Sequence, residues 1–486
     1  MMRLRFLILF FTAATSITAC DKMGSCLNSG GCGDSVNKVC QKDESKGQEL
    51  CSKHFSPTPY LEDFEALKTH ISKSYANLEY LLKHYQIDPY ELNKQTISEI
   101  KAAKNERQAI DALKGFVKKF HDGHFKLREP KNDKSDRTND NKKLPISKTT
   151  PAEKACTSLD FTWDKDYGFR FPIAGVTVKD RGGVEFPYLV FEGNKRRIGI
   201  VRVSDFRTTV YPKICIGSWE KYKTKFESSC DEKCQDDFIH SFMREAIVNQ
   251  FYKSLEKVRA AKVDALVVDV TNNGGGTDWV EDITALTTTK PIVCGKSGFV
   301  KHPHHVNHFK EMLQDIKSNS PNDKQKISDM EEAIKIASQI CDRTPIWTEK
   351  DYKLNCSLVG FRRGDQCKYE ELRHEGKKKY GGKLFLLVNH NTASAAEDIV
   401  ARHLDSKTAT LIGSRTYGAG CGYMNGGIRF QLPNTGLDVR VPDCVRVRAD
   451  GTNEVIGIEP SIHLDMKQMK DAAFLKTLLK KIGTAI

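Results

Sequence analysis

The sequence lacks any long hydrophobic run after its first twenty residues. A helix that crosses a bilayer needs about 20 consecutive apolar residues, so we expect no membrane span in the body of the chain. It also lacks a second closely spaced cysteine pair beside Cys230 and Cys234, which argues against a four-cysteine zinc site. Basic residues are not interleaved with aromatic ones on a recognisable module, so the net charge of +13 predicts no nucleic-acid partner.

The first twenty residues have the layout of a secretory signal. Two arginines are followed by an apolar stretch and then by small residues that end at Cys20. We therefore predict a signal peptide over residues 1–19. The ending Ile-Thr-Ala-Cys resembles a bacterial lipobox, and this resemblance implies that Cys20 is diacylated and anchors the protein to a membrane. Ordinary cleavage near Ala19 is the alternative.

The cysteine count also favours export. The chain has 15 cysteines, and setting Cys20 aside leaves an even number that can pair completely. Such a disulfide framework requires an oxidising compartment, so we predict a periplasmic or surface-exposed lipoprotein of the cell envelope. Cys421 follows a glycine-rich turn, and we expect it in a disulfide, with Cys444 as the candidate partner.

Changes in composition divide the chain into segments. Apolar residues recur at three- and four-residue steps from Leu61 to Leu82, which predicts helices. The expected segments are a signal peptide (1–19), a cysteine-rich tether (20–55), an N-terminal helical subdomain (56–128), a charged loop with linking strands (129–195), a core (196–470) with a polar insertion (300–380), and a C-terminal helix (471–486).

Short apolar runs alternate with helical patterns through the core. The predicted strands are 188–191, 198–203, 265–270, 384–388 and 408–412, and the predicted helices include 242–258, 279–286 and 395–404. This alternation predicts an α/β fold in which helices pack on a mainly parallel sheet.

Three segments carry side chains suited to catalysis. Ser394 lies between a predicted strand and a helix, where free backbone N–H groups could hold an oxyanion, although Ser394-x-x-Glu397 also fits a helix capping box. The glycines of 274–276 permit close backbone approach to a ligand. His124 could act as a general base, although any single histidine is more often structural.

Together these segments resemble the tail-specific, or C-terminal processing, serine peptidases, a family that includes the tricorn core peptidase. The resemblance runs in the family's order from about Tyr60 to Leu464. Asp269–Gly276 resembles the family's Asp-x-Arg-x-Asn-x-Gly-Gly turn, with Thr271 in place of arginine, and Thr392–Glu397 resembles its nucleophile segment. Gly413–Gly420 resembles the strand and turn that follow. Gly457–Ile462 resembles the closing Gly-Val-x-Pro-Asp-Ile element, with Ser461 where aspartate is usual.

The resemblance implies a crotonase-like core and a particular set of roles. The bacterial processing branch uses a serine–lysine dyad, but this chain has Ala419 at the lysine position. The tricorn-like branch instead uses a histidine and a glutamate. The implied residues are Ser394 as nucleophile, His124 as base, Glu454 as the acid that orients His124 directly or through another group, and Gly275 or Gly276 with Ala395 as oxyanion donors. Gly123 replaces a serine of that branch.

Other functions stay open at this point. A non-hydrolytic binding protein on the same scaffold is the main alternative, and an envelope scaffold or adhesin is a third. The His302–His308 cluster has metal-like spacing, but we expect a solvated loop, no metal and no cofactor. The expected partners are a peptide or protein substrate and a membrane. Residues 129–195 are too short and too charged for a PDZ domain.

Overall fold

The computed structural model describes residues 38–43, 48–53, 55–130, 146–163, 165–193, 195–226, 228–276, 279–339, 341–350, 352, 356, 359–362, 374, 376–424 and 426–486. The chain divides into two units, Met1–His54 and Phe55–Ile486. In the first, β1 (Lys38–Asp43) and β2 (Gln48–Lys53) pair antiparallel. The predicted signal peptide and Cys20 lie outside the described residues.

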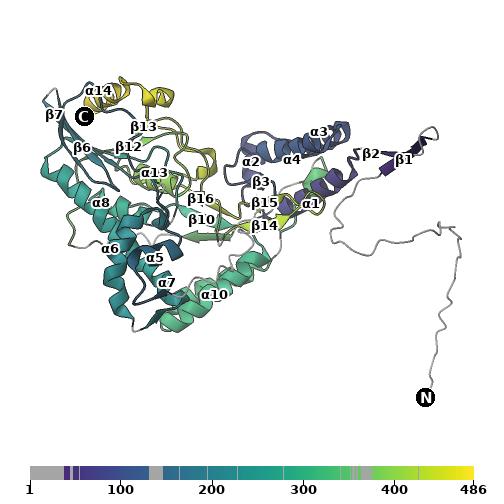
Figure 1. Cartoon of the computed structure of the whole chain (residues 1–486), viewed down its shortest axis with the longest axis horizontal. Helices are drawn as coiled ribbons and strands as arrows, with labels where there is room; N and C mark the ends of the chain where they lie inside the picture. The colour runs from purple at the N-terminus through teal and green to yellow at the C-terminus, as the bar shows by residue number, and fades with distance from the viewer. Residues whose placement is uncertain are drawn as a thin grey trace, which may run out of the picture. The chain divides into compact units, whose positions relative to one another are not determined.

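A seven-stranded sheet forms the centre of the second unit (Figure 1). Its strands, in spatial order, are β17 (Ile462–His463), β13 (Thr410–Gly413), β12 (Lys383–Val388), β9 (Ala265–Asp269), β7 (Arg196–Arg202), β6 (Tyr188–Gly193) and β5 (Val178–Gly182). The strands from β17 to β7 run parallel, while β6 and β5 add an antiparallel edge. The α/β fold predicted from the sequence is confirmed.

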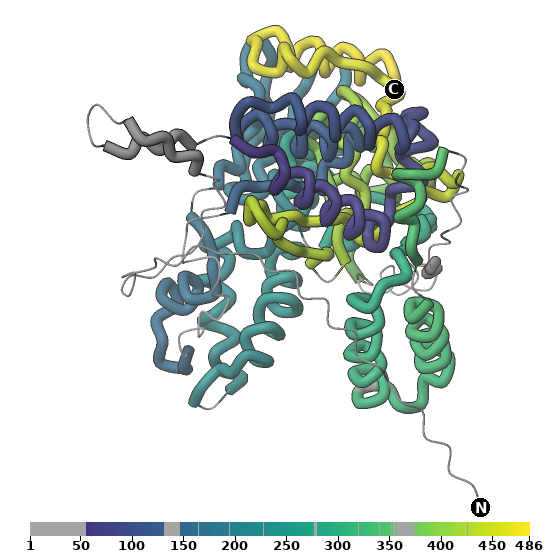
Figure 2. The backbone as a smooth tube through the Cα atoms, turned by 90° about the vertical axis from the view of Figure 1, so that its right-hand side faces the viewer, coloured from purple at the N-terminus to yellow at the C-terminus, as the bar shows by residue number. Residues whose placement is uncertain are grey.

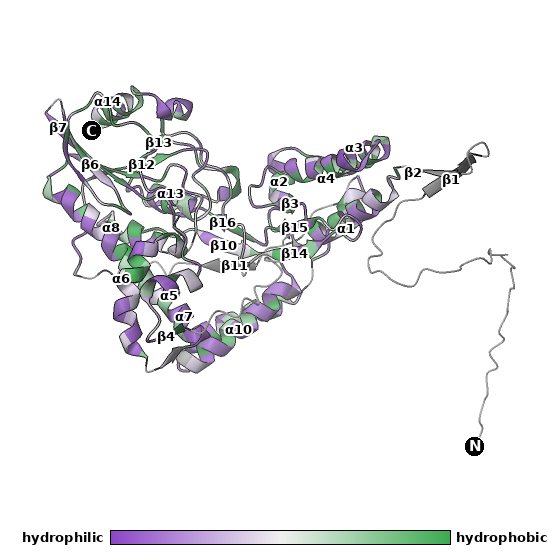
Figure 3. Cartoon of the chain, in the orientation of Figure 1, coloured by the Kyte–Doolittle hydropathy of each residue, from purple (hydrophilic) through white to green (hydrophobic). Residues whose placement is uncertain are grey.

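Alternation along the strands distributes side chains to two apolar layers. Leu266 and Val268 of β9 face one layer, while Ala265 and Val267 face the other. The first layer contains the helices α5 (Ala152–Ser158), α6 (Pro212–Tyr222), α8 (Met243–Ala260), α9 (Val280–Leu286) and α13 (Ala395–Asp405). The second is covered by α14 (Phe474–Ala485), so the sheet is buried on both faces, and its central strands are coloured as hydrophobic in Figure 3.

The chain from Thr58 to Lys118 is helical, as predicted, and packs on a separate small sheet. Its helices are α1 (Thr58–Ser74), α2 (Leu78–His84), α3 (Pro89–Ala102) and α4 (Glu106–Lys118). The sheet has the order β14 (Ile428–Gln431), β15 (Asp438–Val441), β3 (Lys126–Arg128). One apolar cluster joins these helices to β15, so the segment that carries His124 is attached to the C-terminal part of the chain.

Residues 296–362 form helices and strands where the sequence predicted a polar insertion. Helices α10 (Pro303–Asn319) and α11 (Lys324–Ala337) lie side by side (Figure 2). Strand β10 (Lys296–Phe299) pairs with β11 (Val359–Arg362) and with β16 (Cys444–Val447). A short pair, β4 (Ile146–Ser147) and β8 (Ser229–Cys230), precedes α7 (Glu232–Asp237).

Four disulfides join cysteines of the described residues. They are Cys156–Cys215, Cys230–Cys234, Cys341–Cys356 and Cys421–Cys444. The predicted pairing of Cys421 with Cys444 is therefore confirmed, and Cys230 and Cys234 bond each other instead of a metal. None of the helices in the described parts of the chain combines the length and hydropathy that a membrane span requires.

Candidate active site

The carboxyl ends of two parallel neighbours bring the first two predicted segments together. β9 continues into the glycine-rich turn, and β12 ends shortly before Ser394. Asn389 joins the two loops, since its Oδ1 accepts the Asn272 N–H at 3.0 Å and its Nδ2 donates to Asn272 Oδ1 at 2.9 Å. Segments far apart in sequence thus form one rim at the edge of the sheet.

Ser394 has a backbone conformation that ordinary capping serines do not adopt. It is the N-cap of α13, with φ +55° and ψ −117°, whereas N-cap residues usually lie in the β region. Its N–H donates to Oε2 of Glu397 at 3.0 Å, so a capping interaction is present. Capping does not require positive φ, and strain of this kind concentrates at functional sites.

The glycine-rich turn contacts the nucleophile segment closely. Gly275 has φ +93°, and a Cβ there would lie 2.7 Å from Cβ of Ser394 and 2.8 Å from the amide nitrogen of Ala395. Only glycine fits at this position. The N–H of Gly275 donates to Oδ1 of Asn273 at 2.9 Å. Among the described residues, no acceptor contacts the N–H of Ala395 or Gly276, which leaves these two as the available oxyanion donors.

The His124 ring is held in one tautomer. Its Nδ1 lies 2.7 Å from the carbonyl oxygen of Ala419. Because a carbonyl can only accept, Nδ1 carries the proton and donates it to this bond, and Nε2 keeps a lone pair. This is the tautomer that a general base acting through Nε2 requires. Ala419, at the position where a serine–lysine dyad would have its lysine, orients this imidazole through its backbone carbonyl.

Gly422 and Tyr423, in the turn after Ala419, both contact the His124 ring. A Cβ at Gly422 would lie 2.2 Å from Nδ1 of His124, so the imidazole packs directly on this glycine. The ring of Tyr423 meets the imidazole edge-on at 4.9 Å, and its hydroxyl donates to the His124 carbonyl. The disulfide of Cys421 with Cys444 ties this turn to β16.

Asp122 fixes the backbone that presents His124. Its buried carboxylate accepts the His124 N–H at 2.9 Å, the Tyr75 hydroxyl at 2.9 Å and the Asn77 amide at 3.1 Å. A Cβ at Gly123 would lie 1.8 Å from the Tyr417 ring, so tyrosine occupies the space that a serine side chain would need here. In this chain the loop is oriented by Asp122 and packed by Tyr417.

Glu397 connects Ser394 to the turn of Gly418 and Ala419, which contacts His124. Its fully buried carboxylate accepts N–H groups from Ser394, Gly418 at 2.8 Å and Ala419 at 2.9 Å, and the Thr416 hydroxyl at 2.6 Å. Within the described residues, no direct hydrogen bond joins His124 to Ser394. The two are linked through Glu397 and Ala419, and catalytic contacts often tighten only when substrate binds.

The imidazole environment keeps His124 neutral near neutral pH. Burial lowers the pKa of His124 below its ordinary value, because desolvation disfavours the charged ring. Asp122, the Ala419 carbonyl and Glu397 act in the opposite direction. A neutral imidazole is the form that can accept a proton.

Glu454 lies in a 3₁₀ turn (Glu454–Ile456) and contacts an arginine. Its buried carboxylate accepts Nε of Arg446 at 2.6 Å, and Nη2 of Arg446 also donates to the carbonyl oxygen of Ser394 at 3.0 Å. Burial raises the pKa of Glu454 to about 7 against the effect of Arg446. In the described residues no hydrogen bond or ion pair joins Glu454 to His124, so its link to the site runs through Arg446.

Thr271, at the arginine position of the Asp-x-Arg motif, contacts an arginine that comes from another strand. Arg202 of β7 donates to Oδ2 of Asp269 at 2.8 Å, and to the hydroxyl and carbonyl of Thr271 at 3.1 and 3.0 Å. Arg202 and Asp269 are fully buried. The sequence does not reveal these contacts, because the partners are brought together only by the pairing of β7 with β9.

The histidine cluster lies on a helix, not in a solvated loop as predicted. His302 is the N-cap of α10, and its Nδ1 accepts the His304 N–H at 3.2 Å. His305 is fully buried, which lowers its pKa to about 4. Across the described residues, no group of three or more histidine, cysteine or acidic side chains has a metal-binding arrangement.

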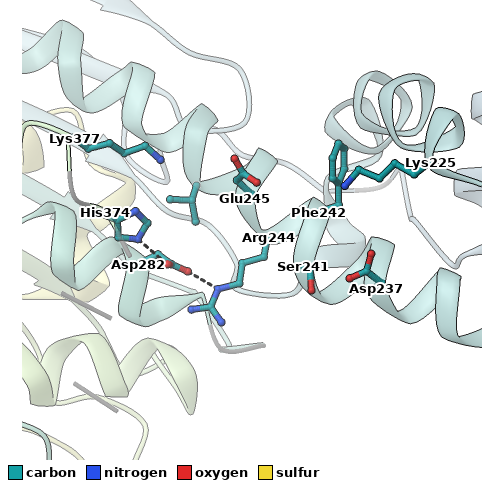
Figure 4. Close-up of a pocket in the computed structure, with 10 residues that line it drawn as sticks. Lys225, Asp237, Ser241, Phe242, Arg244, Glu245, Asp282, His374 and Lys377 are labelled. Atoms are coloured by element: carbon teal, nitrogen blue, oxygen red, sulfur yellow. Dashed lines mark hydrogen bonds and ion pairs between the residues drawn. The ribbon is translucent and has the colours of Figure 1, made fainter. Parts of the chain in front are cut away.

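A pocket of about 340 Å³ contains none of the predicted site residues in its lining (Figure 4). Asp282 lies there between an imidazole and a guanidinium, 2.7 Å from Nε2 of His374 and 2.5 Å from Nε of Arg244. Arg244 also pairs with Glu281 at 3.4 Å, and Glu281 with Arg402 of α13 at 3.1 Å. The pocket wall is thus joined by buried ion pairs to the helix that begins after Ser394.

The profile of peptidase family S41 matches residues 238–464. Ser394, the glycine-rich turn and Glu454 fall inside this range, and His124 falls outside it. Mature CPAF complexed with lactacystin is a similar solved structure, with a TM-score of 0.55 and 13% identity over 87% of this chain and 97% of that chain. Mature CPAF has a TM-score of 0.55 at 14% identity, over 87% and 96% of the two chains. These likenesses concern the fold.

Curated relatives come from Chlamydia. A Chlamydia pneumoniae protein is 24% identical over 295 residues, which are 56% of this chain and 40% of that protein. A Chlamydia muridarum protein is 24% identical over 217 residues, 42% of this chain and 34% of that protein. The chain therefore spans well under half the length of these relatives.

Proposed function

We propose that the chain, whose residues 238–464 match the profile of peptidase family S41, hydrolyses peptide bonds through an acyl-enzyme on Ser394, with His124 as general base. The observation that carries this proposal is the orientation of His124: its Nδ1–H is bound by the Ala419 carbonyl, and that turn is fixed to Ser394 through Glu397. This arrangement favours the tricorn-like branch over a serine–lysine dyad.

The proposed reaction has two halves, formation of the acyl-enzyme and its hydrolysis, and His124 and the oxyanion donors act in both. Nε2 of His124 takes the proton of the Ser394 hydroxyl as Oγ attacks the peptide carbonyl, and the protonated ring then gives it to the leaving amine. Water attacks the resulting ester in the same way and releases the acid. The N–H groups of Ala395 and Gly276 receive the oxyanion, and loss of one such donor costs about 100-fold in kcat.

The experiment uses the protein made in an oxidising compartment, incubated with a diverse peptide library and read by mass spectrometry. A fluorophosphonate probe reports Ser394 in parallel. We expect cleavage and labelling by the wild type, no labelling of Ser394→Ala, and no cleavage by Ser394→Ala or His124→Ala. Ser338→Ala and His463→Ala change the same residue types elsewhere and should leave both signals unchanged.

Two outcomes would contradict the proposal. Cleavage that persists in Ser394→Ala would assign the activity to another residue. A folded wild type that neither cleaves nor labels would favour the alternative, a non-hydrolytic binding protein, and mass spectrometry of a ligand retained on purification would then test that function.

We further propose export and a lipid anchor at Cys20. The four disulfides of the described residues support an oxidising compartment. Feeding cells an alkyne-tagged fatty acid should label the wild-type protein and leave Cys20→Ala unlabelled. Equal labelling of both proteins, or labelling of neither, would remove the anchor from the proposal.

A further inference from the structure

Arg446 of β16 is a buried arginine that contacts the backbone of Ser394. Its exposed fraction is 7%, and its Nη2 donates to the Ser394 carbonyl oxygen at 3.0 Å. Glu454 binds the same guanidinium at 2.5 Å through Nη2 and at 2.6 Å through Nε. Asp398 lies 3.5 Å from Nε. Two carboxylates therefore hold one guanidinium against one peptide group.

That peptide group is the one that presents the oxyanion donor. The carbonyl oxygen of Ser394 and the N–H of Ala395 belong to the same planar unit, and in a trans peptide they point in opposite directions. Fixing the oxygen therefore fixes the direction of the N–H. A cationic hydrogen bond to the carbonyl also polarises the peptide and strengthens its N–H as a donor.

The conformation of Ser394 makes such a restraint necessary. With φ +55° and ψ −117°, the residue does not occupy a well that would hold this peptide in place by itself. The N–H groups of Glu397 and Asp398 approach the same oxygen at 2.9 and 3.2 Å from the helix side. Arg446 approaches it from β16, a different element, so the plane is restrained from two sides.

We propose that Arg446, held by Glu454, is a positioning residue that aims the Ala395 N–H at the oxyanion. The inference rests on the proposed function and changes the role of Glu454. The acid predicted to orient His124 instead acts through Arg446 on the opposite side of the reaction centre. This follows from the contacts of Glu454, since the Nδ1 position of His124 is already occupied by Ala419.

The test compares Arg446→Lys and Glu454→Gln with Arg448→Lys. Lysine has no fork that can contact Glu454 and Ser394 together. Arg448 lies just after the same strand and binds Asp405 at 2.8 Å, which makes it a partly buried ion pair for comparison, without a hydrogen bond to Ser394 in the described part of the chain. We expect kcat to fall about 100-fold in Arg446→Lys, by analogy with loss of an oxyanion donor, with KM within about twofold and Arg448→Lys unchanged.

A double variant, assayed on the alkaline plateau of kcat/KM, separates this role from an effect on the base. Burial raises the pKa of Glu454 to about 7, so on that plateau its carboxylate is charged and holds Arg446. If both residues act on the oxyanion, Arg446→Lys, Glu454→Gln and the double variant lose kcat by similar factors. A loss in Glu454→Gln without one in Arg446→Lys would restore the original role of Glu454 and overturn the inference. Equal kcat in Arg446→Lys and Arg448→Lys would also overturn it.

Two controls keep this result distinct from other failures. Should Arg446→Lys unfold, as shown by its melting temperature, the neutral Arg446→Gln takes its place in the same comparison. A wild type that neither cleaves peptides nor labels at Ser394 would instead refute the proposed function on which the inference rests.

Discussion

Alanine at Gly422 should displace His124, the proposed base, without replacing any residue of the proposed catalytic set. Its Cβ would lie 2.2 Å from Nδ1 and 2.4 Å from Cγ of His124. Ordinary van der Waals contacts of carbon are about 3.5 Å or longer, so the ring must move by more than about 1 Å. Such a shift breaks the bond of Nδ1 to the Ala419 carbonyl, which is 2.7 Å long.

The expected loss is large in activity and small in stability. A misplacement of about 1 Å in a catalytic group costs about 100-fold in rate. Alanine at the positive φ of Gly422, +68°, costs about 1–2 kcal/mol. Gly426→Ala supplies the matched control, because Gly426 has φ +80° and nothing within 4 Å of an added Cβ. Both variants should lose similar stability, and only Gly422→Ala should lose activity.

The assay is kcat/KM on the best peptide from the library, with urea unfolding of each protein. If Gly422→Ala retains the activity of Gly426→Ala, the packing of His124 on this turn does not matter for catalysis. The assignment of His124 as the base would then lose its geometric support.

Three further predictions concern the same site. Since burial lowers the pKa of His124 below 6.5 and only the neutral ring accepts a proton, the activity that Glu454→Gln retains should fall with decreasing pH at a midpoint below 6.5; a higher midpoint in its kcat/KM profile contradicts this. The wild type adds the titration of Glu454, whose pKa is about 7. Glu397→Ala leaves buried N–H groups without their acceptor, so urea unfolding should show a loss of about 3 kcal/mol together with loss of cleavage. Replacing Cys421 and Cys444 by serine opens a bond that spans 23 residues and should cost about 3 kcal/mol, against a smaller loss for the Cys230–Cys234 bond, which spans 4.

The sequence predicts the sheet well because local pattern and burial agree there. Runs such as Leu384–Val388 are apolar throughout, and β12 is buried on both faces. The prediction of a solvated loop for the His302–His308 cluster is wrong, because a polar composition does not by itself mean that a segment is an exposed loop. In the structure Pro303 starts a helix and His305 points into an apolar cluster beside Phe299 and Phe309.

The candidate site is predicted less completely, because several of its contacts use the backbone. Ser394 and His124 can be found from motifs, since their side-chain types limit the possible chemistry. The carbonyl that orients His124 gives no signal, because any residue at 419 presents one. Arg446 and Arg202 gave no signal either, since their partners are fixed only by strand pairing and by the turn before Gly457.

Residue 419 is alanine, whereas a serine–lysine dyad would have its lysine at this position. A dyad needs a basic group there, so alanine first suggests an inactive site. In this fold the same turn is fixed by Glu397 through Gly418 and Ala419, and its carbonyl binds His124. A side chain at 419 would not alter that carbonyl, and it would not be needed once an imidazole supplies the base. Under the proposed function, the turn therefore contributes to catalysis through the backbone carbonyl of residue 419, which every amino acid has.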